Sequence, residues 1–244
     1  MTLVEPSWDQ ARSAASNLGQ FLGSELLSIK EATDRILAID VKPLVELPTY
    51  ETSAMDGYVV AGEGPWKLIG EIKAGAPFKG TLQTGQALGI ATGAVIPDGA
   101  YGVLRWEVAT VEGEIVNGET SERKDFRPAG EEAKLEDILI SRGSKLNPGR
   151  IGLLAASGYD KVEVSVKPKV ALLLFGDEIQ LSGIPKDGFV RDSLGPQIPA
   201  WFEKLGCEVI SVEYVSDNLD ETISAIDKAS KSADIVATTG GTAD

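Results

Sequence analysis

Hydrophobic and polar positions follow three successive patterns along this chain, and the first is helical. Ser7 is followed three residues later by Gln10, which forms a capping box, and apolar residues then recur at helical spacing as far as Leu22. A second box, Ser28 with Glu31, predicts another helix, and Pro43 closes this region. We expect both helices to be structural, because a cap stabilises a helix and supplies no chemistry.

The second pattern covers residues 46–140, where short apolar runs are separated by glycine and proline. The predicted strands are residues 66–72, 87–91, 102–107 and 108–116. Asn117-Gly118 is a hairpin turn signal. Regular short strands are typical of an all-β, barrel-like domain, here inserted between helical segments.

The chain then returns to the first pattern. Asn147-Pro148 predicts the start of a helix that ends at Gly158, and alternating valines predict a strand at residues 162–166. We therefore predict three domains. They are a discontinuous scaffold domain (1–45 and 141–167), an inserted β domain (46–140) and a partial α/β domain (168–244).

The third pattern predicts a doubly wound α/β layer in residues 168–244. Residues 170–175 form a continuous apolar run, as expected for a parallel strand buried on both faces. Apolar residues at helical spacing follow, and then a strand at 207–215, a second helix and a strand at 235–239. This order is βαβαβ, which right-handed crossovers turn into a doubly wound layer.

Polar loops follow each of these three strands. They are Gly176-Asp177-Glu178, Ser216-Asp217-Asn218 and Thr239-Gly240-Gly241-Thr242. Ligands of open α/β sheets bind beyond the carboxyl ends of the strands. Two acidic loops beside a Thr-Gly-Gly loop therefore predict a site for a metal ion and a phosphate.

Composition narrows the chemistry of that site. The chain has no histidine and one cysteine, which excludes Ser-His-Asp and Cys-His catalysis, multi-cysteine metal sites and an internal disulfide framework. We expect Cys207 to be a small buried apolar residue. Any bound metal would be a hard, oxygen-liganded ion such as Mg²⁺.

Charge and hydropathy narrow the class of partner. With a formal charge of −14, the chain is a poor binder of nucleic acid and of anionic membranes. No apolar run approaches the ~20 residues of a membrane span, and the N-terminus lacks the pattern of a secretion signal, so we expect a cytoplasmic protein.

The most specific motif is Ser53-Ala54-Met55-Asp56-Gly57-Tyr58. Asp-Gly between apolar residues is first of all a turn signal. The whole string, however, resembles the signature of the molybdopterin molybdotransferases, the family that includes MoeA and the gephyrin E domain. Further matches follow in the family's order, at Ala91-Thr92-Gly93-Ala94, at Gly130-Glu131-Glu132 and at the first two strand-end loops.

This resemblance implies an enzyme of molybdenum cofactor biosynthesis. Family members insert molybdate into adenylylated molybdopterin with release of AMP, use Mg²⁺ and form homodimers. The molybdopterin adenylyltransferase is a further implied partner. A two-fold arrangement would place Asp56 of one subunit opposite Glu178 of the other.

The resemblance also implies site residues. The implied catalytic residues are Asp56, Thr92, Glu178 and Asp217. The implied cofactor-binding residues are Ser53, Gly176, Asp177, Asp192, Ser193, Thr239, Gly240, Gly241 and Thr242. The implied metal ligands are Glu178, Asp217 and Glu132.

The sequence departs from the family pattern at two positions. Glu132 stands where the family has aspartate, and Leu194 stands where it has asparagine. The chain also stops soon after the Thr-Gly-Gly loop, so we expect a C-terminally truncated family member. Two alternatives therefore stay open: a catalytically incompetent scaffold or interaction module of the same fold, and a general nucleotide-binding α/β protein.

Overall fold

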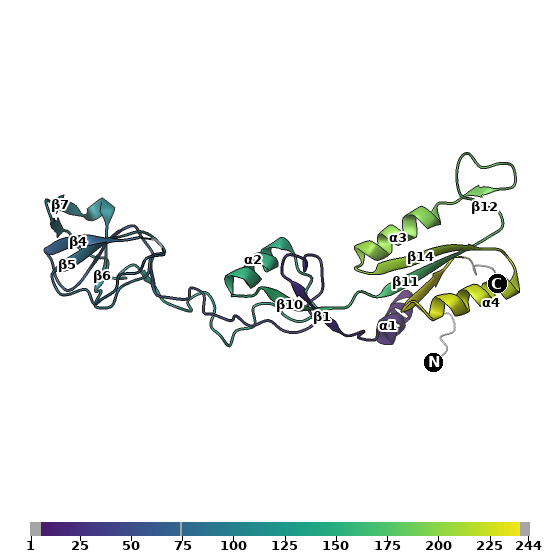
Figure 1. Ribbon diagram of the computed structural model, residues 1–244, viewed down its shortest axis with the longest axis horizontal. Coiled ribbons are helices and arrows are strands. Elements are labelled where there is room, and N and C mark those ends of the chain that lie inside the picture. Colours follow the sequence, from purple (N-terminus) through teal and green to yellow (C-terminus); the bar gives the residue numbers. More distant parts are fainter. Residues whose placement is uncertain (1–5, 74, 240–244) are drawn as a thin grey trace. The chain divides into compact units, whose positions relative to one another are not determined.

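A computed structural model of the chain describes residues 6–73 and 75–239 (Figure 1). The chain forms two compact units, which are described separately below. Unit 1 comprises Met1–Leu27, Glu31–Ala38 and Val162–Asp244, and unit 2 comprises Ser28–Lys30 and Ile39–Lys161. The predicted inserted β segment lies inside unit 2. The units do not follow the predicted three-domain boundaries, which stay a prediction.

A three-stranded parallel sheet organises unit 1, and it confirms the predicted βαβαβ order (Figure 1). The strand order is β14-β11-β15, with β11 in the middle. The elements are β11 (Lys169–Phe175), α3 (Leu194–Lys204), β14 (Glu208–Val215), α4 (Leu219–Ser230) and β15 (Ile235–Thr238).

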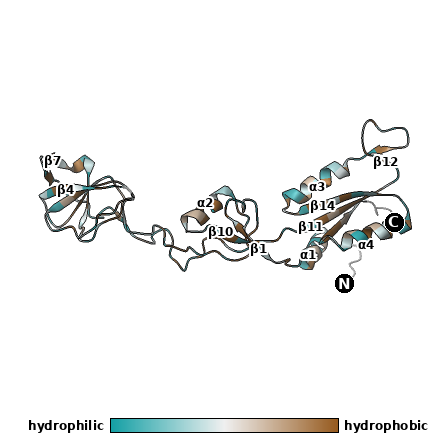
Figure 2. Ribbon diagram, viewed as in Figure 1, coloured by the Kyte–Doolittle hydropathy of each residue, from teal (hydrophilic) through white to brown (hydrophobic). Residues whose placement is uncertain are grey.

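The two helices of this layer cover opposite faces of the sheet. Leu173 of β11 packs in one apolar cluster with Ala225 and Ala229 of α4, whereas the neighbouring Leu174 lies beside Gly195 of α3. Successive strand residues point to opposite faces, so α3 and α4 lie on different sides (Figure 1). This explains why residues 170–174 are apolar and buried without interruption, as the hydropathy colouring of β11 shows (Figure 2).

The N-terminal segment agrees with the sequence in its first helix and differs in its second. Helix α1 (Trp8–Leu18) starts with the expected capping box, in which the backbone N–H of Ser7 donates to Gln10 Oε1 at 2.9 Å. The predicted helix at Ser28 and Glu31 is wrong. Ser28 ends strand β1 (Ser24–Ser28), which pairs with β10 (Lys161–Ser165).

Tertiary pairing explains that difference. Leu37, which the helical spacing placed on an apolar helix face, instead forms an antiparallel bridge with Val164 of β10. Both side chains are buried there. Burial against a distant strand outweighs the small free-energy preference of a short segment for helix.

A six-stranded mixed sheet forms the β part of unit 2, in the order β6-β3-β5-β4-β8-β7. The elements of unit 2 are β2 (Thr52–Ser53), β3 (Gly57–Val60), β4 (Trp66–Ile72), β5 (Gln86–Ile90), β6 (Gly102–Arg105), a 3₁₀ turn (Trp106–Val108), β7 (Thr110–Glu112), β8 (Ile115–Asn117), β9 (Phe126–Arg127) and α2 (Pro148–Ala156). Within the described residues this sheet has two edge strands, β6 and β7, so it is open where the sequence predicted a barrel-like domain. Strands β4, β5 and β6 and helix α2 lie where they were predicted.

One predicted strand and one predicted turn are wrong. Residues 108–116 form a hairpin, because β7 and β8 pair antiparallel around Gly113, which has a φ of 63°. The predicted turn at Asn117-Gly118 therefore follows the hairpin. Gly113 supplies the positive φ that a tight hairpin turn needs, and it does so without a neighbouring asparagine.

Apolar clusters lie on both faces of the six-stranded sheet. Val59 and Val60 are adjacent on β3 and belong to different clusters. Glycine is required at the start of this strand, because a β-carbon at Gly57 would lie 2.2 Å from the carbonyl oxygen of Leu104 on β6. Within the described residues, no helix has the length and apolar character of a membrane span.

Candidate functional site

Unit 1 brings the ends of its strands together as the sequence predicted. Phe175 of β11 is in register with Val215 of β14, so their following loops start at the same level. The backbone N–H of Asp177 lies 3.4 Å from Asp217 Oδ2, and the N–H of Asp217 lies 3.3 Å from Asp177 Oδ1. These reciprocal contacts place two predicted site residues next to each other. We call residues 176–178, 192–193, 217 and 239 the strand-end site.

The third strand end is tied to the first by hydrogen bonds. The N–H of Thr239 donates to the carbonyl of Leu173 at 3.1 Å, and Thr239 Oγ1 accepts from the N–H of Phe175 at 3.1 Å. Within the described residues, the hydroxyl proton of Thr239 has no hydrogen-bond partner. Gly240, Gly241 and Thr242, also predicted to bind cofactor, lie outside the described residues.

A cavity of about 260 Å³ opens at these strand ends. It brings together four predicted site residues, Glu178, Asp192, Ser193 and Thr239. Gly176 begins the loop that carries Glu178, and its carbonyl accepts from the N–H of Ile179. Asp177 and Asp217 are not among the residues that line the cavity, so the strand-end site has a cavity and an adjacent pair of carboxylates.

The Asp192 carboxylate is buried and fully hydrogen-bonded. Its Oδ1 accepts from the N–H groups of Leu194 and Gly195 at 3.0 and 2.8 Å, and its Oδ2 accepts from the Tyr214 hydroxyl. Burial opposes ionisation of Asp192, but these hydrogen bonds outweigh it and lower the pKa of the carboxyl. Asp192 thus closes the first turn of α3, and its predicted cofactor contact stays a prediction.

Gly195 and Tyr214 were not recognised in the sequence, yet the structure depends on both. A β-carbon at Gly195 would lie 2.3 Å from Asp192 Oδ2 and 2.4 Å from the Tyr214 hydroxyl. The hydrogen bond to Asp192 raises the pKa of Tyr214. A glycine within a helical segment carries no signal of this contact, because the tyrosine lies 19 residues further along the chain.

The strand-end carboxylates fit only one mode of magnesium binding. Within residues 6–73 and 75–239, no three acidic or cysteine side chains converge closely enough to hold a metal ion by themselves. Asp177 and Asp217 each keep one carboxylate oxygen outside their mutual contact. Mg²⁺ commonly binds through one or two carboxylates together with substrate phosphates and water, and this pair fits that mode.

The second group of predicted residues lies in unit 2, at the Ser53-to-Tyr58 string, which we call the signature loop. Asp56 Oδ1 accepts from the backbone N–H of Thr92 at 2.7 Å and from its hydroxyl at 3.1 Å. Both residues are exposed. The structure therefore joins two predicted catalytic residues that are 36 positions apart, and both contacts use Oδ1 of Asp56.

Ser53 has a different environment within the signature loop. Its side chain is wholly buried, and its hydroxyl donates to the carbonyl of Met55 at 2.5 Å. This contact shapes the turn that presents Asp56, and direct cofactor binding by Ser53 stays a prediction.

Glu132, the predicted metal ligand of unit 2, is exposed, and its N–H donates to the carbonyl of Leu47.

An ion pair between a half-exposed arginine and a buried aspartate supports the signature loop and was also missed in the sequence. Arg105 donates from Nε and Nη2 to the two oxygens of Asp125, at 2.8 and 2.7 Å. The Asp125 carbonyl in turn accepts from the N–H of Ala54. The Arg105 hydrogen bond lowers the pKa of Asp125. Asp125 has a φ of 54°, a conformation that its sequence neighbours do not signal.

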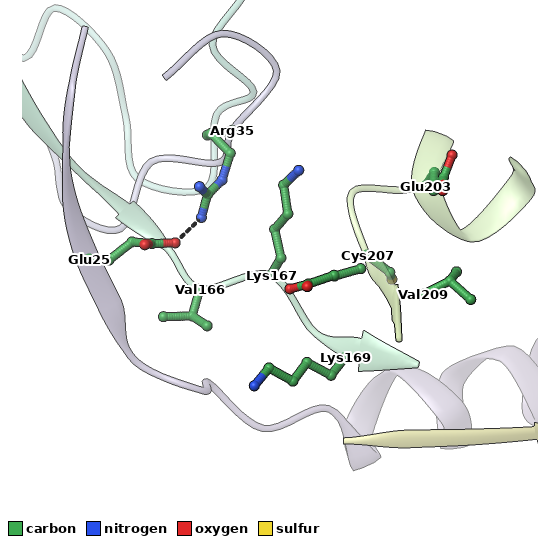
Figure 3. A pocket seen from close by; sticks show the side chains of 9 residues that line it. Glu25, Arg35, Val166, Lys167, Lys169, Glu203, Cys207 and Val209 are labelled. Atoms are coloured by element: carbon green, nitrogen blue, oxygen red, sulfur yellow. Dashed lines mark hydrogen bonds and ion pairs between the residues drawn. The ribbon is translucent and has the colours of Figure 1, made fainter. Parts of the chain in front are cut away.

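A larger cavity, about 620 Å³, lies elsewhere in unit 1 and contains no predicted site residue (Figure 3). Three cationic and three acidic side chains line it, including the Arg35–Glu25 pair at 2.5 Å. Cys207 lines the same cavity, and burial raises the pKa of its thiol. Cys207 is therefore half-buried, where the sequence predicted a buried residue, and the raised pKa argues against a reactive thiolate.

Comparison with known proteins assigns the two parts of the chain to protein families. Residues 6–158 match the family described as "MoeA N-terminal region (domain I and II)". Residues 171–243 match the family described as "Probable molybdopterin binding domain". The second match contains every residue of the strand-end site.

Curated relatives and solved structures agree with these matches. The chain is 33% identical over 229 residues to a Molybdopterin molybdenumtransferase of Staphylococcus aureus and 33% identical over 232 residues to one of Staphylococcus epidermidis. Each match covers 88% of this chain and 54% of the relative, so the chain spans about half the length of these relatives. A molybdopterin biosynthesis moeA protein structure from Pyrococcus horikoshii OT3 is similar with a TM-score of 0.82 and 28% identity, over 89% of this chain and 61% of that one.

Proposed function

This chain belongs to the MoeA family, and on that premise we propose that it acts in molybdenum cofactor biosynthesis as a molybdopterin molybdotransferase. In the proposed reaction, molybdate is inserted into adenylylated molybdopterin and AMP is released. The strand-end site would bind the pterin nucleotide.

The observation that carries this proposal is a cavity at the ends of β11 and β15, beside an acidic pair that joins the ends of β11 and β14. Glu178, Ser193 and Thr239 line that cavity, and the Asp177–Asp217 pair is tied together by backbone contacts. A cavity at the carboxyl edge of a parallel sheet is where α/β folds bind nucleotides. The segment also matches a molybdopterin-binding family, which a general nucleotide-binding protein would not explain.

The chain's own residues have separate roles in this proposal. The Thr239 hydroxyl, which accepts from the N–H of Phe175, donates its own proton to the ligand, and Ser193 offers a second hydroxyl. Glu178 orients the polar groups of the ligand from the cavity wall. Asp177 and Asp217 would hold Mg²⁺ together with ligand phosphates, and that ion would neutralise charge and orient the anions.

In unit 2, Asp56 and Thr92 form the second proposed catalytic group. The Thr92 hydrogen bonds keep the Asp56 carboxylate in one orientation, with Oδ2 available for a proton or a polar ligand. We further propose that the working protein is a cytoplasmic homodimer that receives its substrate from an adenylyltransferase. A shared site, with Asp56 from one subunit and Glu178 from the other, requires a dimer. Light scattering that gave a monomer mass at high protein concentration would refute it.

Calorimetric titration with AMP tests the strand-end site. We expect binding in the presence of Mg²⁺, loss of binding in EDTA, and at least tenfold weaker binding by Glu178→Ala, which removes one hydrogen-bonding carboxylate. Glu203→Ala is the matched control, because Glu203 is an exposed glutamate of α3 that does not line this cavity. A folded protein that gave no heat under any condition would favour the scaffold alternative.

A further inference from the structure

We propose that Arg191 binds the phosphoryl group of the ligand in the strand-end cavity. This inference rests on the proposed function and adds an anion-binding residue to it. Arg191 lies in strand β13 (Val190–Arg191), and it is the only cationic side chain among the residues that line the cavity within the described part of the chain.

The helix ends near the strand-end site are closed to a phosphate. The first two N–H groups of α3, from Leu194 and Gly195, already donate to Asp192, and the next residue, Pro196, has no N–H. At the start of α4, Asn218 accepts from the N–H groups of Asp220 and Glu221. Helix N-termini are common phosphate sites because their N–H groups are free, and here they are occupied.

One nitrogen of the Arg191 guanidinium is hydrogen-bonded to the protein, and the other two face no protein acceptor among the described residues. Its Nη1 donates to the carbonyls of Gln180, at 3.3 Å, and of Leu181. Pairing of β13 with β12 (Ile179–Gln180) fixes the backbone that carries it. Within residues 6–73 and 75–239, Nε and Nη2 have no recorded partner, so three N–H donors remain for a ligand.

The positive charge of Arg191 favours binding of an anionic ligand in this cavity. The chain carries a formal charge of −14, so an anionic ligand approaches a negatively charged protein, and a cation in the cavity offsets that repulsion. A guanidinium binds phosphate oxygens through parallel hydrogen bonds, which a single hydroxyl cannot reproduce. Ser193 and Thr239 then supply neutral donors beside it.

Calorimetric titration of AMP and of adenosine into four proteins tests the inference. The proteins are the unchanged chain, Arg191→Gln, Arg191→Lys and the control Lys186→Gln, which removes one positive charge from the neighbouring loop. We expect Arg191→Gln to weaken AMP binding about tenfold or more and to leave adenosine binding unchanged, because only AMP has the phosphoryl group. Arg191→Lys keeps the positive charge and loses the paired N–H donors of the guanidinium. Its affinity for AMP should therefore lie between that of the unchanged chain and that of Arg191→Gln. Lys186→Gln binds AMP as the unchanged chain does.

The outcomes separate this inference from the proposed function. An unchanged chain that binds AMP, together with Arg191→Gln that binds it equally well, overturns the role of Arg191 and leaves the proposed function standing. An equal loss of AMP and adenosine binding overturns it too, because Arg191 would then only hold the residue 181–189 loop in place. An unchanged chain that binds neither AMP nor adenosine refutes the proposed function and this inference with it.

Discussion

Substitution of Gly195 by alanine should disrupt the first turn of α3. The added β-carbon would lie 2.3 Å from Asp192 Oδ2, 2.4 Å from the Tyr214 hydroxyl and 3.0 Å from Leu174 Cδ1. Ordinary van der Waals contact begins near 3.4 Å, so the carboxylate and the phenol must each retreat by roughly 1 Å. If the Asp192 carboxylate and the Tyr214 phenol move away from the new methyl group, Asp192 loses hydrogen bonds to Tyr214 and to the N-terminus of α3.

The expected loss of stability has two parts. Forcing one methyl group into a well-packed site costs about 1–3 kcal/mol. Weakening a hydrogen bond to the buried carboxylate costs roughly 1.5–3 kcal/mol when it is lost completely. Partial relaxation makes the sum smaller, and we expect a decrease of about 2–4 kcal/mol in the free energy of opening of α3.

Hydrogen exchange read by mass spectrometry resolves α3 from unit 2, where denaturant unfolding of the whole chain would mix the two units. A decrease of about 3 kcal/mol accelerates exchange of the α3 amides by roughly a hundredfold. Gly152→Ala in α2 is the control, because a β-carbon there meets nothing within 4 Å. The double variant Gly195→Ala/Tyr214→Phe should recover part of the loss. Unchanged α3 protection in Gly195→Ala would refute the argument.

Three further predictions concern other contacts. Asp125 has a lowered pKa, so its stabilisation is present above its ordinary pKa of 3.8 and is lost as pH falls through the lower native value. The urea midpoint of unit 2, followed by hydrogen exchange of its own amides, should show Asp125→Asn less stable at pH 7 and nearly equal to the unchanged chain at pH 2. Tyr214 has a raised pKa, so Asp192→Asn should shift one tyrosine ionisation to lower pH in an ultraviolet titration. Asn147→Ala removes the side chain that accepts from the N–H of Arg150, and exchange protection of α2 should fall by about 1 kcal/mol.

Patterns that repeat within one element were readable from the sequence. The β11 run is apolar throughout because both faces of that strand are covered, and the Asn147-Pro148 cap marks the start of α2 by local chemistry alone. The strand-end loops could be grouped because parallel strands bring their carboxyl ends to one edge. Each of these inferences needed only local geometry and one topological rule.

Contacts between residues far apart in the chain could not be predicted from the sequence. The segment from Ser28 to Leu37 has a helical pattern of apolar residues. It nevertheless pairs with strand β10, which lies more than 120 residues further along the chain. Arg105 and Asp125 belong to no common sequence motif. Gly195 looks in the sequence like a residue of low helix propensity and gives no sign of its close contacts. In each case a tertiary partner decides the structure, and a single sequence does not name that partner.

The Asp192–Tyr214 contact links the fold of unit 1 to the way its site can recognise an anion. Asp192 occupies the backbone donors at the start of α3, and the tyrosine hydroxyl keeps it there. A carboxylate in that position repels a phosphate from the helix end, so within the described residues the proposed anion contacts are side chains at the cavity wall. Recognition by one arginine is more sensitive to salt than recognition by backbone dipoles, because a guanidinium's charge on an exposed surface is screened within about 10 Å at 0.1 M salt. On the proposed role of Arg191, the same buried carboxylate that stabilises α3 would make ligand binding depend on charge at Arg191.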